Sequence, residues 1–135
     1  MTIEDIEQML WQQLKAKVAS GAIPIRGGVY YDRDLANISE DITVKAIAVG
    51  GFGNRQRADV NINVFVDDKK KNKNAYIADK ERLAELSRCV LDYIAAIDFI
   101  SEPTGTVSCT QHVYEEPSLH QHYANFLLSI KLYDC

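Results

Sequence analysis

Residues 58–66 have the sequence Ala-Asp-Val-Asn-Ile-Asn-Val-Phe-Val, in which two sets of positions alternate. The first set is Ala58, Val60, Ile62, Val64 and Val66, and the second is Asp59, Asn61, Asn63 and Phe65. A period of two is typical of a strand that packs one face against a core and turns the other toward water or a partner. The stretch therefore predicts a long strand at or near the centre of a sheet.

The N-terminal residues have the pattern of an amphipathic helix. Thr2 and Asp5 form the sequence signature of a capping box, with Asp in place of Glu. Apolar residues then recur at helical spacing, namely Ile3, Ile6, Leu10, Leu14 and Val18. We expect a helix over about residues 3–19, with Trp11 packed at the edge of the core and not serving as an interface anchor.

Two strands are predicted between this helix and the central strand. Residues 28–32 form a short strand, and residues 41–49 form a longer one with alternate apolar positions. The turn-forming residues Gly50, Gly51, Gly53 and Asn54 follow. They precede a strand instead of opening a helix, and they lack the Gly-Lys-Ser/Thr ending of a phosphate loop, so we expect a hairpin turn.

A charged segment follows the central strand. Residues 67–74 are predicted to form a surface loop that is too long for a tight hairpin and too charged to be buried. Asp79 is a good N-cap for a second helix. The core side of that helix carries Leu83, Leu86, Val90, Ile94 and Ile97, and its outer side carries Lys80, Glu81, Glu85 and Arg88.

Two last strands, about residues 104–114 and 122–133, are predicted to form a hairpin around Pro117. With the turn centred between Pro117 and Ser118, one face carries Val107, Cys109 and Val113 beside Leu128, Phe126 and His122, with Gln111 opposite Ala124. The other face carries Thr106, Ser108, Thr110 and His112 with Ser129, Leu127, Asn125 and Tyr123. The first face is largely apolar, so the sheet is expected to be covered on one side only.

The order of elements is helix, three strands, helix, two strands. This order predicts an α+β fold in a single domain over residues 1–135. The expected architecture is a two-layer sandwich, with an antiparallel or mixed sheet of about five strands and both helices on one face.

Composition disfavours several classes of protein. The net charge of −4 and the pI near 5.3 disfavour a general nucleic-acid binder, because the phosphate backbone attracts a basic surface. The three cysteines are Cys89, Cys109 and Cys135, and no two of them form a CxxC motif. Free thiols in a reducing compartment are therefore expected. No apolar run approaches the length of a membrane span, and the N-terminus is acidic, which predicts a cytoplasmic protein without membrane contact.

Three histidines, His112, His120 and His122, lie close together in the sequence beside Glu115 and Glu116. His-x-His on a strand can place two imidazoles within reach of one metal ion. The predicted register, however, sends His112 and His122 to opposite faces. We therefore expect no metal and no cofactor, and we keep a small metal- or ligand-binding module in this region, or a small hydrolase, as the alternative function.

Catalytic signatures are absent from the sequence. Cys109 is expected to point at Phe126 as a small buried hydrophobe and not to pair with a histidine. No GxSxG or HExxH motif occurs. The acids Glu40, Asp41, Glu115 and Glu116 are interpreted as solvated surface residues, so no catalytic residue is assigned and the protein is not expected to be an enzyme.

A basic cluster provides the candidate interface. Its members are Lys69, Lys70, Lys71 and Lys73, which Arg55 and Arg57 of the preceding turn could join. Such a cluster can contact an acidic partner or nucleic acid, although a solubilising surface loop has the same composition. No aromatic residues are interleaved with the lysines, which disfavours nucleic acid as the partner.

The ordered pattern resembles the bacteriophage tail-terminator (minor tail protein U-like) and related tail-completion families. The resemblance extends over nearly the whole chain. It rests on the two helices, on Gly28-Val29-Tyr30, on the polar segment 33–37, on Glu40-Asp41-Ile42-Thr43-Val44, on Val60-Asn61-Ile62-Asn63-Val64-Phe65-Val66 and on Tyr123-Ala124-Asn125-Phe126. A neck or head-tail joining protein would fit the same order of elements.

The resemblance implies a structural role in the virion. It implies an α+β subunit that assembles in the host cytoplasm into a ring, often a hexamer, on the end of the phage or prophage tail tube. The ring would stop growth of the tube and offer a surface to the neck. The implied partners are copies of the same chain and the tube and neck proteins, without membrane or sequence-specific nucleic acid.

Overall fold

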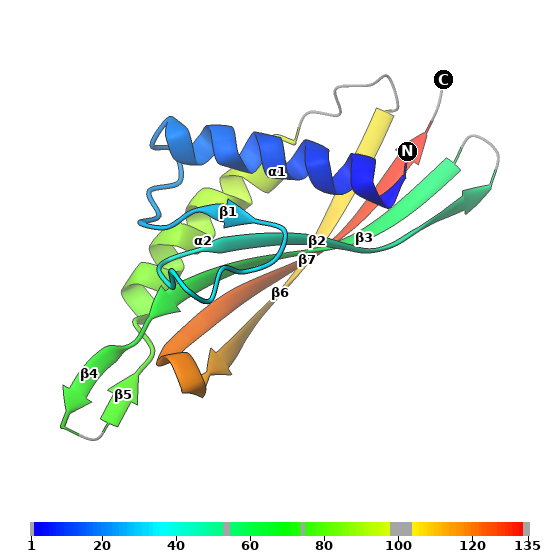
Figure 1. The fold of residues 1–135 in the computed structure, drawn as a ribbon. Helices are drawn as coiled ribbons and strands as arrows, with labels where there is room; N and C mark the ends of the chain where they lie inside the picture. Colours follow the sequence, from blue (N-terminus) through cyan, green and yellow to red (C-terminus); the bar gives the residue numbers. More distant parts are fainter. Residues whose placement is uncertain (1, 53–54, 74, 98–103, 134–135) are drawn as a thin grey trace.

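The computed structural model describes residues 2–52, 55–73, 75–97 and 104–133 (Figure 1). Within these residues a sheet has the strand order β1-β2-β3-β7-β6. Its strands are β1 (Val29–Tyr30), β2 (Ile42–Phe52), β3 (Arg55–Asp67), β6 (Thr104–Glu116) and β7 (Gln121–Tyr133). The helices are α1 (Ile3–Ala19) and α2 (Lys80–Ala95). A small hairpin, β4 (Lys69–Asn72) with β5 (Ala75–Ile77), and a 3-10 turn, Pro117–Leu119, complete the fold.

The predicted two-layer α+β sandwich is confirmed. β3 lies in the middle of the sheet, antiparallel to β2 on one side and to β7 on the other, while β1 runs parallel to β2. The first alternating set of this stretch, Ala58, Val60, Ile62, Val64 and Val66, is buried on the helix side, and Val64 and Ile62 are both 0% exposed. Because burying such a side chain contributes about 1.5–3 kcal/mol, this one strand holds a large part of the core.

Helix α1 begins at the predicted capping box. The Thr2 hydroxyl accepts a hydrogen bond from the Asp5 amide (3.1 Å), and the Asp5 carboxylate accepts one from the Thr2 amide (2.8 Å). The bond from the Thr2 backbone lowers the pKa of Asp5. Trp11 is half-buried at the edge of the core, as expected, and its Nε1 donates to the Val29 carbonyl (2.9 Å).

Helix α2 begins after the predicted N-cap, where the Asp79 side chain accepts from the Arg82 amide. Its core side includes Leu86 and Val90, both 0% exposed. The Tyr93 hydroxyl donates to Gln13 Oε1 (2.8 Å) and so joins α2 to α1 on the same face of the sheet. Neither helix is long and apolar enough to cross a membrane, as far as the described residues go.

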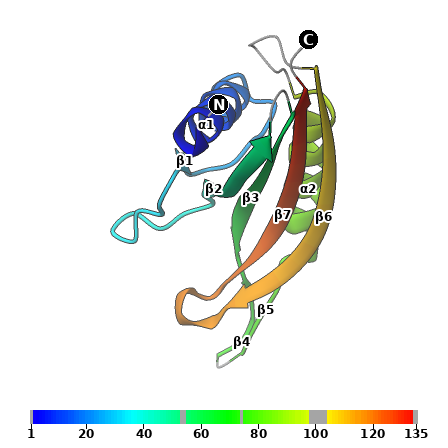
Figure 2. The same ribbon diagram turned by 90° about the vertical axis from the view of Figure 1, so that its right-hand side faces the viewer.

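The β6–β7 register differs from the predicted one by two residues. Cys109 lies opposite Leu128 instead of Phe126, because the Pro117–Leu119 turn and the left-handed residue His120 lengthen the connection. An even shift keeps every side chain on its predicted face. Val113 is nevertheless 62% exposed and not part of the core. Figure 2 shows the reason: the turn end of β6 and β7 extends beyond α2.

One local prediction is wrong. The segment after β3 is not a loop but the β4–β5 hairpin, a separate two-stranded sheet that projects from the end of the sandwich (Figures 1 and 2). Its strands escape prediction because they are exposed on both sides and therefore carry no apolar alternation. The hairpin predicted at the glycines is confirmed, because β2 and β3 are antiparallel and pair as far as Phe52 opposite Arg55. Gly50 and Gly51 are strand residues of β2, while Gly53 and Asn54 of the predicted turn lie outside the described residues.

Glu40 and Asp41 are buried, at 2% and 1% exposure, and not the solvated acids that were expected. Arg82 of α2 donates to both Glu40 oxygens, each at 2.7 Å, and the Arg26 amide donates to Oε1 (3.2 Å). Burial alone would raise the pKa of Glu40, but the hydrogen bonds and charge of Arg82 outweigh it and hold that pKa below its usual value. This pair ties α2 to the connection between β1 and β2.

Asp41 organises the same connection through its backbone neighbours. Its carboxylate accepts from the Gly28 amide (3.3 Å), the Ser39 amide (3.2 Å) and Arg33 Nε (3.2 Å). The chain passes so close that a Cβ at Gly27 would overlap the Asp41 carboxylate and the Glu40 carbonyl. The end of the connection, residues 39–41, is therefore packed against the fold together with Arg33, whereas its middle is solvated, with Leu35 67% exposed.

Candidate interaction surfaces

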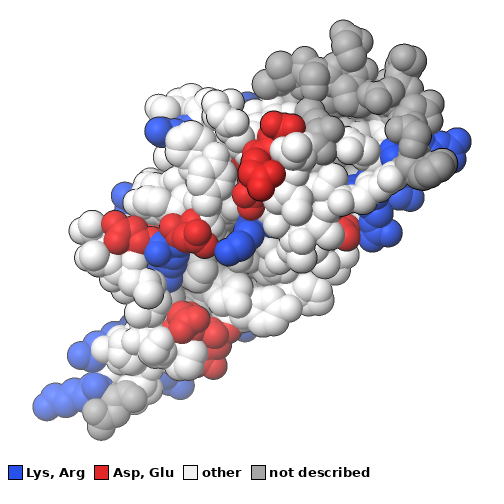
Figure 3. All heavy atoms as spheres, turned by 45° about the vertical axis from the view of Figure 1, so that its right-hand side comes forward, with Lys and Arg blue, Asp and Glu red and all other residues white. Residues whose placement is uncertain are grey.

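The six predicted interface residues form two separate groups and not one cluster. Lys69, Lys70 and Lys71 lie on β4 and Lys73 follows it, whereas Arg55 and Arg57 begin β3. The ends of β3 are about 40 Å apart, because a strand rises about 3.3 Å per residue. Figure 3 shows Lys and Arg side chains gathered at the projecting hairpin and, separately, at the opposite end of the molecule.

The β4–β5 hairpin is attached to the sandwich mainly at its base. The Tyr76 ring of β5 stacks on His120, with 3.8 Å between the ring centroids. Just before the hairpin, the Asp68 carboxylate lies within hydrogen-bond distance of His122 Nδ1 (2.6 Å), and the Asp68 amide donates to the His120 carbonyl (2.9 Å). Lys69 reaches back to Asp79 (3.7 Å). Lys70 and Lys71 of β4 are exposed to solvent.

The second basic group lies on the sheet itself. Arg57 is paired with Asp59 (Nε to Oδ1, 3.3 Å) and lies opposite Lys131 of β7. Arg57 is 63% exposed, so this ion pair is largely solvated. Such pairs contribute little to stability, which leaves the group available to an acidic partner.

The three histidines lie in three different environments. His122 is paired with Asp68 on the helix side, and His120 stacks on Tyr76 in the turn. His112 lies on the opposite face, next to Tyr114 (5.9 Å between ring centroids). No group of three His, Cys, Asp or Glu side chains that could hold a metal ion occurs among the described residues. The structure therefore does not bring together the ligand set of the alternative function, and absence of a metal stays a prediction.

Cys89 and Cys109 lie at the edge of the core and are less buried than the expected small buried hydrophobe. Cys89 and Cys109 are free and half-buried, and Cys135 lies outside the described residues. Burial raises the pKa of the Cys109 thiol, which disfavours the reactive thiolate. His112 lies three residues away on the opposite face of β6, so it cannot serve Cys109 as a base.

The face of the sheet away from the helices, here called the open face, carries a row of aromatic rings. Phe65 of β3, Tyr123 of β7 and Tyr114 of β6 lie directly opposite one another in the register. Their centroids are 4.8 Å apart between Phe65 and Tyr123 and 5.3 Å apart between Tyr123 and Tyr114. The Arg33 guanidinium covers the Phe65 ring at 3.9 Å, and its Nη2 donates to the Ser39 carbonyl (3.0 Å).

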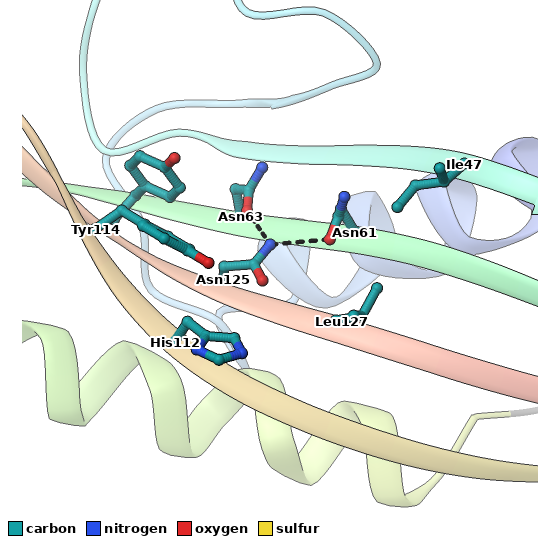
Figure 4. Close-up of a pocket in the computed structure, with 8 residues that line it drawn as sticks. Ile47, Asn61, Asn63, His112, Tyr114, Asn125 and Leu127 are labelled. Atoms are coloured by element: carbon teal, nitrogen blue, oxygen red, sulfur yellow. Dashed lines mark hydrogen bonds between the residues drawn. The ribbon is translucent and has the colours of Figure 1, made fainter.

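A second row on the open face consists of amide side chains. Asn125 Nδ2 donates to Asn61 Oδ1 (3.0 Å) and to Asn63 Oδ1 (2.7 Å), as Figure 4 shows. The amides and the rings line a shallow groove of about 360 Å³, here called the open-face groove. Its lining is Ile47, Asn61, Asn63, His112, Tyr114, Tyr123, Asn125 and Leu127, none of which is Lys, Arg, Asp or Glu.

Sequence reasoning placed these residues on the correct face but did not identify a groove. Asn61 and Asn63 occupy the outward phase of the central strand, and Asn125 and Tyr123 occupy that of β7. Which of them become neighbours depends on the strand order and on the registers of β3, β7 and β6. The available signal was the run of uncharged polar residues on a strand face that the helices do not cover.

Comparison with known proteins adds no assignment to these surfaces. No model of a known protein family matches the chain, and a search of curated proteins finds no match either.

Proposed function

We propose that the protein is a structural subunit of a phage or prophage tail, which caps the tail tube as a ring and connects it to the neck. The observation that carries this proposal is the β4–β5 hairpin, an exposed arm outside the main sheet. An isolated two-stranded hairpin is at best marginally stable in water. Such an arm is suited to order against a neighbouring subunit.

A second surface of the subunit suits the same assembly. β6 is an edge strand and pairs, among the described strands, with β7 alone. Its exposed residues include Val113, at 62%. An unpaired edge offers backbone donors and acceptors to another chain. An arm and an edge are different surfaces, so one contact between them is heterologous and, repeated with closed rotation, generates a ring.

The proposed role in a tail rests on the resemblance described above, which concerns the order of the elements and the sequences of the strands. The subunit acts in this proposal by assembly and not by chemistry. Free subunits are expected to remain monomeric until they bind the end of the tube. Each contact between subunits is small, and the ring becomes stable only when all contacts form together on closure.

The test is native mass spectrometry at high protein concentration, with and without purified tail tubes. A variant with residues 69–74 replaced by a two-residue Gly turn is expected to fold but to form no ring. A control variant, Lys70→Gln with Lys71→Gln, keeps the arm and removes charge. If the intact protein neither forms a ring nor binds tube ends, the proposal is wrong. If the shortened variant assembles as the intact protein does, the arm is not the contact.

A further inference from the structure

We propose that the open-face groove binds an extended, uncharged segment of a partner polypeptide, held through its main chain. This inference concerns a surface that the ring contact above does not use. It rests on the arrangement of three asparagine side chains, on the aromatic wall beside them and on the absence of charge from the groove lining.

The amide groups of the groove are held in place and only partly used. Asn125 is 8% exposed, and its Nδ2 makes both hydrogen bonds of the cluster. These bonds occupy the Oδ1 atoms of Asn61 and Asn63. Among the described residues, no side chain or backbone group bonds the Nδ2 atoms of Asn61 and Asn63 or the Oδ1 of Asn125. The groove thus offers two fixed donors and one fixed acceptor, and fixed groups lose little entropy when they bind.

The backbone under these groups has the repeat of an extended polypeptide. The Cα atoms of Asn61 and Asn63, two residues apart on β3, repeat at about 6.6–6.8 Å, and both side chains turn their Oδ1 atoms toward Asn125 Nδ2 (3.0 and 2.7 Å). Carbonyl groups on one side of an extended chain repeat at the same distance. A segment running along β3 can therefore place two carbonyl oxygens on the two donors, while an N–H between them donates to Asn125 Oδ1.

The walls of the groove determine which segment fits. Tyr114 and Tyr123, whose ring centroids are 5.3 Å apart, form an aromatic surface in the groove lining. Figure 4 shows Tyr114 on one side of the amides, and Leu127 and Ile47 supply apolar surface on the other side. Burial raises the pKa of Tyr123, so its hydroxyl stays protonated and can donate. A charged segment would lose hydration here without gaining an opposite charge from the lining, and the nearest cation in the register is Lys45 of β2, opposite Asn61. A phosphate backbone would likewise find no cation in the lining.

The first test selects binders from a yeast-displayed library of random decapeptides and measures the best synthetic peptide by fluorescence anisotropy. Asn63→Asp is the informative variant, because its carboxylate still accepts from Asn125 but no longer donates into the groove. We expect affinity to fall about tenfold or more, the cost of one lost hydrogen bond to a group left unpaired. Ser108→Asp adds the same charge on the same face outside the lining, and should bind as the wild type does.

The second test asks whether the main chain is recognised. N-methylation of the peptide nitrogen that faces Asn125 should weaken binding about tenfold, whereas methylation of the next nitrogen, which faces away, should not. If no selected peptide distinguishes wild type from Asn63→Asp, the proposal is wrong. It is also wrong if maltohexaose or a decathymidine strand occupies the groove and peptides do not. Ring assembly is measured separately, so failure here is distinguishable from failure of the proposed function.

Discussion

The buried ion pair between Arg82 and Glu40 makes Arg82→Met the most informative stability variant. Methionine keeps most of the apolar stem but removes the two 2.7 Å hydrogen bonds to Glu40. Glu40 is 2% exposed, so its carboxylate would be left buried without its main partner. Breaking a buried pair in this way costs about 3–5 kcal/mol, and the 18% exposure of Arg82 places the expected loss at the lower end, about 3 kcal/mol.

The expected loss depends on pH with a definite sign. In the wild type the pKa of Glu40 lies below its ordinary value of 4.5, so the pair stabilises the protein above pH 4.5 and this contribution is lost as pH falls through the lowered pKa. In Arg82→Met, burial is opposed only by the Arg26 amide (3.2 Å) and the exposed Arg26 guanidinium (3.8 Å), so we expect the pKa of Glu40 to rise and acid to restore a neutral, better tolerated side chain. The deficit of the variant should therefore shrink between pH 7 and about pH 4.

The assay is urea unfolding followed by circular dichroism at pH 7 and pH 4. Lys45→Met serves as the matched control, because its ion pair with Asp32 is exposed at both ends (66% and 85%) and should cost less than about 1 kcal/mol. Adding Glu40→Gln to Arg82→Met should recover part of the loss, since no buried charge then remains. A loss below about 1 kcal/mol at pH 7, or a loss that does not change with pH, would refute the reasoning.

Three further predictions follow from the core, the first helix and the histidines. Phe126→Ala should lower the free energy of unfolding by about 3–5 kcal/mol, because Phe126 is 0% exposed. Leu127→Ala, on the open face, should lower it far less. An unchanged urea midpoint for Phe126→Ala would place Phe126 outside the core. Thr2→Ala should cost about 1 kcal/mol in thermal unfolding through loss of the capping box, and Thr2→Ser should not. Elemental analysis should find no stoichiometric transition metal, because His112 and His122 lie on opposite faces; about one zinc per chain that His122→Ala removes would contradict this.

Local pattern determined the elements of this protein and the direction in which their side chains point. The capping box of Thr2, the N-cap Asp79 and the alternation of residues 58–66 all appear where they were expected. Periodicity alone carries this information, because a period near 3.6 or 2 assigns each residue to a face before any partner is known. The α+β class then follows from the order of the elements.

Tertiary structure alone decided which residues are neighbours. The β6–β7 register was misplaced by two residues because such a shift leaves every face unchanged, so alternation cannot distinguish the two pairings. Arg55 and Lys69 are far apart because β3 runs between them as one continuous strand. A turn in this segment would have brought the two basic groups together. Glu40 is buried in contact with Arg82, which lies far away in the sequence. Ion pairs between such distant residues leave no periodic pattern in the sequence, so periodicity cannot predict them.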